Sequence, residues 1–174
     1  MISIWKKIKE EPFKAGFRKL IKKTFQLSDQ RVVDFDIKNE GPVVCALVIT
    51  KDNKVVLVKQ FRPGPEKILL ELPGGMIEAG EEAEKAMARE LLEETGYAGE
   101  IKFVGTSLDC AYSTMLRCNF VVINCEKIQE QKLDENEFAE VVEMPMVEFR
   151  KHLQTGELTD IESGYLGLDF LGLL

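Results

Sequence analysis

A carboxylate-rich helix bounded by glycines is the feature of this sequence that most restricts its fold. The segment Glu71–Tyr97 reads ELPGGMIEAGEEAEKAMARELLEETGY. Its LPGG start at 72–75 predicts a sharp turn, where glycines let backbone carbonyls approach a ligand closely. A helix is expected near residues 82–95, and Gly96 stands where a helix C-cap glycine belongs. The fold must therefore accommodate a turn-helix-turn unit between its neighbouring segments.

Three glutamates of this helix, Glu90, Glu93 and Glu94, fall on one face at helical spacing. Like charges one turn apart repel, and Lys85 and Arg89 are expected to lie to the side of this stripe. The pattern favours a cation from solution, because Mg²⁺ and Mn²⁺ bind a few carboxylates together with waters and substrate phosphates. The alternative is a solvated acidic face, which is the usual meaning of a run of charge.

The segments around this helix predict a mixed sheet. Runs rich in β-branched residues, bounded by turn signals, indicate strands at 31–37, 43–49, 55–61, 68–72, 101–109, 118–128 and 137–145. Two further helices are expected, one over 146–154 and a final one in TDIESGYLGLDFLGL. A helix inserted among mixed strands predicts an α+β fold, an α/β/α sandwich with a mixed sheet.

The N-terminal segment differs from the rest in charge. Eight basic residues and two glutamates give residues 1–25 a charge of +6. Since the net charge of the whole chain is −7, the remainder carries −13. Apolar residues recur at helical spacing on either side of Pro12, so two short amphipathic helices are expected in a separate extension over 1–28. We expect the apolar stripe to pack on the body or on a second subunit. Contact of residues 1–25 with an anionic membrane surface is the alternative.

Composition excludes several other classes of protein. The net charge of −7 gives no strong signal for nucleic-acid binding, and a single histidine, His152, argues against a His-based triad or a multi-His metal site. The four cysteines form no CxxC pair and are expected to be reduced, as in a cytoplasmic protein. Neither a signal peptide nor a membrane span is indicated.

The acidic helix and its flanks resemble the Nudix box, G-x5-E-x7-R-E-U-x-E-E-x-G-U. Eight positions match, and only the last departs, because Tyr97 replaces an aliphatic residue; the matching residues are Gly75, Glu81, Arg89, Glu90, Leu91, Glu93, Glu94 and Gly96. Residues 58–75 and 155–168 are also similar to the ADP-ribose and nucleoside-diphosphate-sugar branch of that family. The resemblance implies a Nudix-type α/β/α sandwich over 29–174 and leaves residues 1–25 unexplained.

The resemblance also implies a reaction, the metal-dependent hydrolysis of a nucleoside diphosphate linked to another group. Glu90 and Glu94 would be metal ligands, joined by Glu93 and by the carbonyl of Gly74 or its neighbouring glycine. Arg89 would hold a glutamate by a charge-assisted hydrogen bond. Glu81 is expected to have a structural role, and members of this branch are generally dimers.

The substrate residues are less well defined by the resemblance. Arg62 resembles the family's substrate-contacting arginine, and a surface salt bridge is the alternative. The downstream loop DCAYSTMLRC at 109–118 lacks the proline and glutamate of the family pattern, so the general base is left among Glu93, Glu137 and Glu135. Tyr112 in this loop would stack on a nucleobase or would be a core residue.

Three functions follow from the resemblance. The leading one is hydrolysis of ADP-ribose or a nucleotide sugar to a nucleoside monophosphate and a phosphorylated group. The second is hydrolysis of dinucleoside polyphosphates or RNA 5′ ends. The third is a non-catalytic ligand sensor with the same fold, against which the complete set of Glu90, Glu93 and Glu94 argues.

Overall fold

The computed structural model describes residues 5–16, 18–133 and 138–174, and the chain divides into two compact units. The first unit runs to Pro42 and includes Leu108–Leu116, and the second comprises Val43–Ser107 with Arg117–Leu174. The described strands are β1 (Lys6–Ala15), β2 (Arg18–Gln26), β3 (Val32–Lys38), β4 (Val43–Thr50), β5 (Lys54–Arg62), β6 (Lys67–Glu71), β7 (Gly74–Met76), β8 (Tyr97–Leu108), β9 (Leu116–Lys127) and β10 (Ala139–Pro145). The described helices are α1 (Ala83–Thr95), α2 (Met146–Thr155) and α3 (Ile161–Phe170).

Strand β4 builds two cores in the second unit. Its sequence VVCALVIT is apolar almost throughout, as is typical of a strand covered on both faces. Successive side chains point to opposite faces of a strand. Leu47 accordingly joins a core with Phe149 of α2 and Leu168 of α3, whereas Val48 joins a core with Met87 of α1. One continuous apolar run thus holds helices on both sides of the sheet.

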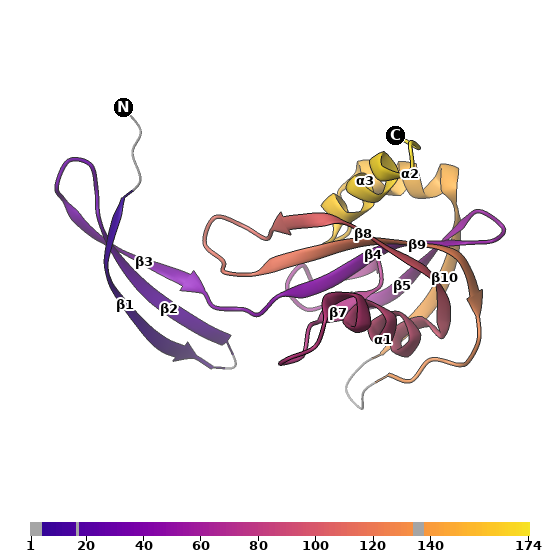
Figure 1. The fold of residues 1–174 in the computed structure, drawn as a ribbon, viewed down its shortest axis with the longest axis horizontal. Coiled ribbons are helices and arrows are strands. Elements are labelled where there is room, and N and C mark those ends of the chain that lie inside the picture. The colour runs from indigo at the N-terminus through magenta and orange to yellow at the C-terminus, as the bar shows by residue number, and fades with distance from the viewer. Residues whose placement is uncertain (1–4, 17, 134–137) are drawn as a thin grey trace. The chain divides into compact units, whose positions relative to one another are not determined.

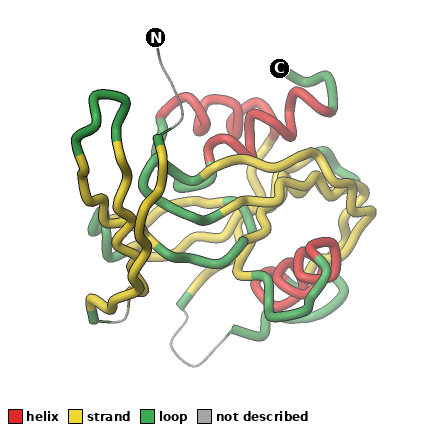
Figure 2. Tube along the Cα trace, turned by 60° about the vertical axis from the view of Figure 1, so that its left-hand side comes forward, coloured by secondary structure: helices red, strands yellow, loops and turns green. Residues whose placement is uncertain are grey.

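The second unit is a three-layer α/β/α sandwich, with α1 on one face of the sheet and α2 and α3 on the other (Figures 1 and 2). The strand order is β10-β5-β4-β9-β8, with β6 beside β5 and β7 beside β4. Strand β4 pairs in parallel with β9 and antiparallel with β5 and β7, so the sheet is mixed. The α/β/α sandwich with a mixed sheet that the sequence predicts is confirmed.

Strand β7 is an element that the sequence does not indicate, because LPGG predicts only a turn. Gly74 and Gly75 instead pair with Cys45 and Val44 of β4. The approach is close enough that a Cβ on Gly74 would stand 2.2 Å from the carbonyl oxygen of Val44. Glycine is therefore needed for the backbone of β7 to reach the sheet.

The first unit is a three-stranded antiparallel sheet in the order β1-β2-β3, and the prediction of two helices in this segment is wrong. The hairpin between β1 and β2 contains Gly16, whose φ is +61°. Lys22 of β2 lies opposite Glu11 of β1 and Asp36 of β3, and opposite charges across strands stabilise a sheet. Pro12 is tolerated because β1 is an edge strand of this sheet.

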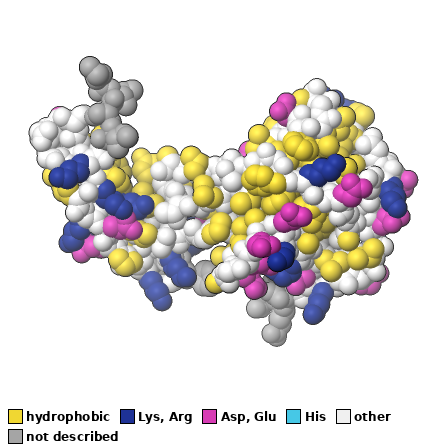
Figure 3. All heavy atoms as spheres, in the orientation of Figure 1, with side chains coloured by type: hydrophobic (Ala, Val, Ile, Leu, Met, Phe, Trp, Pro, Cys, Tyr) yellow, Lys and Arg dark blue, Asp and Glu magenta, His cyan; other side chains and the backbone are white. Residues whose placement is uncertain are grey.

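The first unit comprises more than β1 and β2. Strand β3 completes the sheet, and the loop Leu108–Leu116 belongs to the same compact unit. Lys38 at the end of β3 forms a parallel bridge with Ser113, which connects the loop to the sheet. Lys and Arg side chains are visible on the surface of this unit in Figure 3. Among the helices that the structure describes, none has the length and apolar character to cross a membrane.

Candidate active site

Helix α1, which carries most of the box residues, is packed against the sheet along one side. Its inner side buries Met87 and Leu91 in the core shared with β4. The helix ends at Gly96, whose φ of 76° is left-handed and whose N–H donates to the carbonyl of Leu92. Since glycine adopts this conformation without steric cost, the end of the helix is sharply defined.

Two carboxylates of α1 converge on strand β7. Glu94 Oε2 accepts a hydrogen bond from the N–H of Gly74 at 2.9 Å. Glu90 lies against Gly75 so closely that a Cβ on this glycine would stand 2.3 Å from the Glu90 carboxyl carbon. The missing Cβ at Gly75 therefore leaves room for the Glu90 carboxylate, while Gly74 contributes the backbone N–H that Glu94 accepts.

Arg89 connects several acidic groups of the box. Its Nε and Nη2 donate to both oxygens of Glu81 at 3.0 and 2.9 Å, and Nη1 donates to Glu90 at 2.9 Å and Glu93 at 3.2 Å. Nη2 also donates to the carbonyl of Met76, the last residue of β7. The guanidinium lowers the pKa of the Glu81 carboxyl, and these carboxylates raise the pKa of Arg89.

Arg89 directly precedes Glu90 on α1, so its Cα lies to the side of the acidic stripe. Its long side chain reaches Glu90 and Glu93, so part of the repulsion on the helix is offset within the protein. Over the described ranges, no three His, Cys, Asp or Glu side chains are gathered closely enough to enclose a metal ion. The donors nevertheless fit a hard divalent cation, because they are carboxylate oxygens beside a backbone that carries no Cβ at Gly75.

Arg62, at the end of β5, contacts a buried carboxylate. Its Nε donates to Glu71 Oε2 at 2.5 Å, and the Arg62 side chain is 41% exposed while that of Glu71 is 0% exposed. The other oxygen of Glu71 accepts hydrogen bonds from the backbone N–H and the hydroxyl of Thr159. The salt bridge that the sequence left as an alternative for Arg62 is thus present, but its acidic partner is fully buried.

Asp160 lies next to this group, at the N-cap of α3. Its Oδ2 is buried and has no hydrogen-bond partner among the described residues, and Arg117 approaches Oδ1 only to 4.0 Å. Burial raises the pKa of Asp160 to about 6, with a further contribution from the charge of Glu71. Sequence reasoning did not single out either carboxylate, although Glu71 directly precedes the LPGG turn.

Tyr112 belongs to the aromatic cluster of the first unit. Its ring stacks on Phe35 of β3 with centroids 6.4 Å apart, and Phe35 also stacks on Trp5 at 5.8 Å. Tyr112 is 57% exposed, so it is not a core residue. Its backbone carbonyl accepts the N–H of Lys38, which fixes the loop to the edge of the sheet.

The candidates for a general base are in different situations. Glu93 is 45% exposed at its side chain and is paired with Arg89. Glu135 and Glu137 lie outside the described residues.

Tyr97 replaces the aliphatic residue at the end of the box. Its ring is buried in the core beneath α1, and its hydroxyl donates to Glu143 of β10 at 2.5 Å. Burial, followed by the neighbouring Glu143, raises the pKa of Tyr97 to about 12. Tyr97 therefore fills the apolar position with its ring while its hydroxyl reaches a polar partner at the edge of the sheet.

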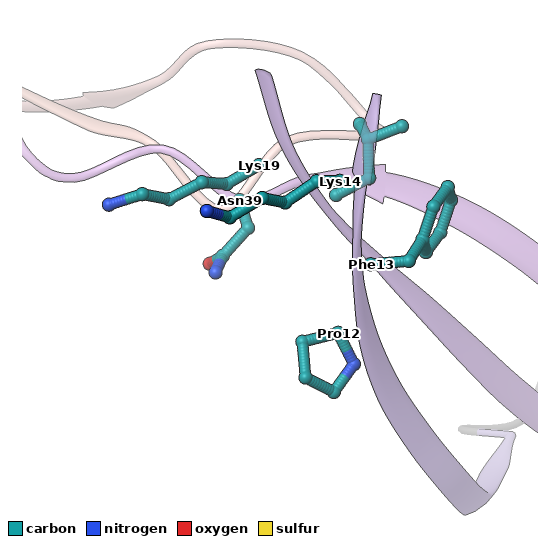
Figure 4. A pocket seen from close by; sticks show the side chains of 6 residues that line it. Pro12, Phe13, Lys14, Lys19 and Asn39 are labelled. Atoms are coloured by element: carbon teal, nitrogen blue, oxygen red, sulfur yellow. The ribbon is translucent and has the colours of Figure 1, made fainter. Parts of the chain in front are cut away.

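Two hollows lie on the first unit and involve no residue of the box. One of about 380 Å³ is lined by Glu11, Phe13, Lys22 and Asp36. The other, of about 280 Å³, is shown in Figure 4, where Lys14 and Lys19 extend to the same side beside Asn39. Lys14 and Lys19 are directly opposite each other on β1 and β2.

Known proteins resemble this chain over most of its length. An ADP-ribose pyrophosphatase of Bacillus subtilis (strain 168) is 29% identical over 160 residues, which cover 90% of this chain and 86% of the relative. A methanol dehydrogenase activator of Bacillus methanolicus is 28% identical over 154 residues, covering 87% and 83%. The crystal structure of an ADP compounds hydrolase superposes with a TM-score of 0.80 at 17% identity, covering 100% of this chain and 99% of that one.

These similarities agree with the box and with the three-layer architecture. The match to the solved structure supports the fold alone, because a sequence identity this low does not extend to function. The family model described as the NUDIX domain matches residues 39–161, which is well over half of the chain. The chain therefore belongs to the NUDIX family of hydrolases.

Proposed function

We propose that this chain hydrolyses the pyrophosphate bond of ADP-ribose or a related nucleotide sugar, releasing a nucleoside monophosphate and a phosphorylated sugar. The observation that carries the proposal is the convergence of two box carboxylates on one strand, with Glu94 bound to the N–H of Gly74 and Glu90 against Gly75. The name of the B. subtilis relative, an ADP-ribose pyrophosphatase, supports this substrate class.

Nudix hydrolases are generally dependent on a divalent metal. Here we assign Mg²⁺, with Mn²⁺ as the alternative, to the carboxylates of Glu90, Glu93 and Glu94 and the carbonyl of Gly74. When bound, the metal neutralises pyrophosphate charge and lowers the pKa of a water molecule. Arg89 holds Glu90 and Glu93 in place through its hydrogen bonds and thereby orients their remaining lone pairs.

The general base takes a proton from the attacking water. We assign this role first to Glu93, which is half-exposed and lies on the box helix, then to Glu137 and Glu135. Glutamine at the true base is expected to lower kcat by about two to four orders of magnitude. Metal affinity should be retained if the base is Glu137 or Glu135, but it should fall together with kcat if the base is Glu93, because that carboxylate is also assigned to the metal. If all three glutamine variants keep the kcat of the parent protein, none of these side chains is the base.

Two residues are proposed to bind the substrate. Arg62 offers its guanidinium to a phosphate, which an arginine can grip through two parallel hydrogen bonds. Tyr112 offers an exposed ring face to the nucleobase, and its stacking on Phe35 supports such a role because the ring is already held in one orientation.

A substrate panel tests the proposed activity. ADP-ribose, ADP-glucose, UDP-glucose, GDP-mannose, a dinucleoside tetraphosphate and a 5′-triphosphorylated RNA are each incubated with the protein and Mg²⁺ or Mn²⁺, and AMP, GMP and UMP are quantified. We expect AMP and ribose 5-phosphate from ADP-ribose. Preference for the tetraphosphate or the RNA would support the second function instead. Binding of ADP-ribose without turnover under any of these conditions would indicate a ligand sensor.

The assembly and location are part of the same proposal. The first unit leaves large apolar side chains exposed, including Trp5 at 45% and Ile8 at 47%, and we propose that a second copy of the chain covers them in a homodimer. Contact of residues 1–25 with an anionic membrane is the alternative. The four cysteines are free thiols, which agrees with a reducing compartment, and we propose the cytoplasm.

A further inference from the structure

We propose that Glu71 is a positioning residue whose buried carboxylate fixes the guanidinium of Arg62 for a phosphate of the substrate, and that Thr159 fixes Glu71 in turn. The inference rests on the proposed function, because it takes Arg62 to be a substrate-binding residue. It adds a second layer to the site, in which the loop before α3 determines how Arg62 is presented.

The burial of Glu71 is the first observation. Its side chain has no exposed surface, and a buried carboxylate is costly unless it is paired and hydrogen-bonded. Here Oε2 accepts from Arg62 Nε, and Oε1 accepts from the backbone N–H and the hydroxyl of Thr159. Each oxygen thus has a donor on a different segment, so the carboxylate is held from two sides.

The way in which Arg62 is held is the second observation. Only its Nε is used, and neither Nη atom donates a hydrogen bond to any residue in the described part of the chain. The guanidinium is planar and its donors are rigidly arranged, so a bond at Nε fixes the direction of the two Nη groups. The 41% exposure of this side chain leaves those groups accessible to a phosphate.

The strand register explains why the two side chains meet. Arg62 lies opposite Lys67 in the β5–β6 hairpin, and Glu71 lies opposite Val58. Val58 and Arg62 are separated by an even number of residues along β5, so Arg62 and Glu71 point to the same face of the sheet. Glu71 is the last residue of β6 and lies three residues before Gly74. Strand β6, whose Glu71 binds Arg62, therefore leads directly to the backbone N–H that Glu94 accepts.

Thr159 has one hydroxyl proton and two acidic neighbours. Its Oγ1 makes a close contact with Glu71 and lies 3.2 Å from Asp160 Oδ1. The shorter contact and the additional backbone N–H both favour Glu71 as the acceptor. The segment before α3 therefore holds the Glu71 carboxylate in the position where it pairs with Arg62.

A double-mutant cycle tests the inference. The variants Arg62→Ala, Glu71→Gln and their combination are assayed with ADP-ribose and saturating Mg²⁺. Arg62→Ala is expected to raise KM at least about ten- to a hundredfold, which is the range for losing even one of its two hydrogen bonds to a charged phosphate. Glu71→Gln is expected to raise KM about three- to tenfold with kcat changed less than about twofold, since the contact serves binding. The combined variant should have the KM of Arg62→Ala alone.

Matched controls separate positioning from general damage. Glu157→Gln removes an exposed ion pair to Lys67, the residue opposite Arg62, and should leave KM unchanged. Thermal unfolding of each variant shows whether it is folded. If Glu71→Gln does not fold, Thr159→Val takes its place in the cycle, with a KM increase that is again expected to vanish when Arg62 is already alanine.

The possible outcomes are distinct. If the fold increase in KM of the combined variant equals the product of the fold increases of the two single variants, Glu71 acts independently of Arg62, and the inference is overturned. An unchanged KM in Glu71→Gln, or in Thr159→Val where it is used, would overturn it as well. If Arg62→Ala keeps the parental KM, the substrate role of Arg62 fails and the inference fails with it. If ADP-ribose is not cleaved, the proposed substrate is wrong, and the same cycle with the substrate that the panel identifies decides the inference.

Discussion

Glu94 is the residue for which the ligand assignment is most easily separated from a structural role. Its carboxylate accepts the N–H of Gly74, and a glutamine oxygen of the same shape can accept that bond as well. Glu94→Gln therefore removes the ligand charge and keeps the contact with β7. We expect hydrolysis to fall below detection in a steady-state assay, with a melting temperature close to that of the parent protein.

The matched control for this change is Glu84→Gln, an exposed residue in the first turn of the same helix. It alters the net charge by the same amount and should keep the parental kcat. Near-normal turnover of Glu94→Gln at saturating Mg²⁺ would show that the metal-ligand assignment is wrong.

Asp160 makes the stability of the fold dependent on pH. Its folded-state pKa of about 6 lies above the ordinary value of 3.8, because the group is buried next to Glu71 and only distantly compensated by Arg117 and Arg62. The folded state therefore favours the protonated carboxyl, and the cost of ionisation grows as pH rises from 4 to 6. Asp160→Asn should stabilise the protein at pH 8 by up to about 3 kcal/mol, and the gain should shrink toward pH 4.

Urea unfolding at pH 5, 6, 7 and 8 measures this dependence. Asp169→Asn, an exposed position on the same helix, is the control and should show no such trend. A gain from Asp160→Asn that is constant over this range, or a loss of stability at pH 8, would contradict the placement of Asp160 as a buried charge.

At the scale of residues, spacing reveals only those groups that one element brings together. Glu90, Glu93 and Glu94 are predictable because helical periodicity places them on one face. The contact of Glu71 with Thr159 joins residues that are 88 positions apart, and no local pattern indicates it. The buried position of Asp160 depends in the same way on how α3 packs on the sheet.

At the scale of elements, strand β7 determines how the box helix meets the sheet. A Cβ at Gly75 would overlap the Glu90 carboxylate, whereas a Cβ at Gly74 would overlap the backbone of β4. Gly75→Ala should therefore displace a movable side chain and lower kcat by at least about tenfold, because ligand geometry is disturbed. Gly74→Ala should instead lower the melting temperature, since a backbone strand has to shift.

Activity assays and thermal unfolding of both variants distinguish these effects. Gly64→Ala is the control, because a Cβ there meets nothing within 4 Å and should alter neither quantity. A Gly75→Ala protein with the kcat of the parent would contradict the functional role given to the Glu90–Gly75 contact.

The N-terminal strands show where a sequence pattern misleads at this scale. Apolar residues in this segment recur at intervals that a helix would align, yet Ile8, Phe13, Leu20, Ile21 and Phe25 lie in β1 and β2. Charge pairing across strands, such as Lys22 with Glu11 and Asp36, depends on a register that only the folded sheet defines. By contrast, the continuous apolar run of β4 is rich in β-branched residues and is bounded by turn signals, which favours a buried strand, and the predicted strand at 43–49 stops one residue before the observed end.

At the scale of the whole molecule, the two units differ in what stabilises them. The two cores of the second unit, as far as the described residues define them, draw on buried residues from Val44 onward. The first unit is a thin sheet that leaves Trp5, Ile8 and Phe13 between 38% and 47% exposed. Burial of each such side chain is worth roughly 1.5–3 kcal/mol, which is the driving force available for association with a second copy.

Deletion of residues 1–25 removes β1 and most of β2 and tests what this sheet is for. Because both cores of the second unit lie outside the deleted segment, we expect a folded protein by circular dichroism that is monomeric by light scattering, against a dimeric full chain. The control Lys14→Gln/Lys19→Gln keeps the apolar surface and removes two positive charges that face each other across β1 and β2. This variant should remain dimeric. A full chain that is monomeric, or a truncated chain that stays dimeric, would contradict the proposed interface. Binding of the full chain to anionic vesicles that is lost in both variants would assign the sheet to a membrane surface instead, since electrostatic attraction there requires the basic side chains.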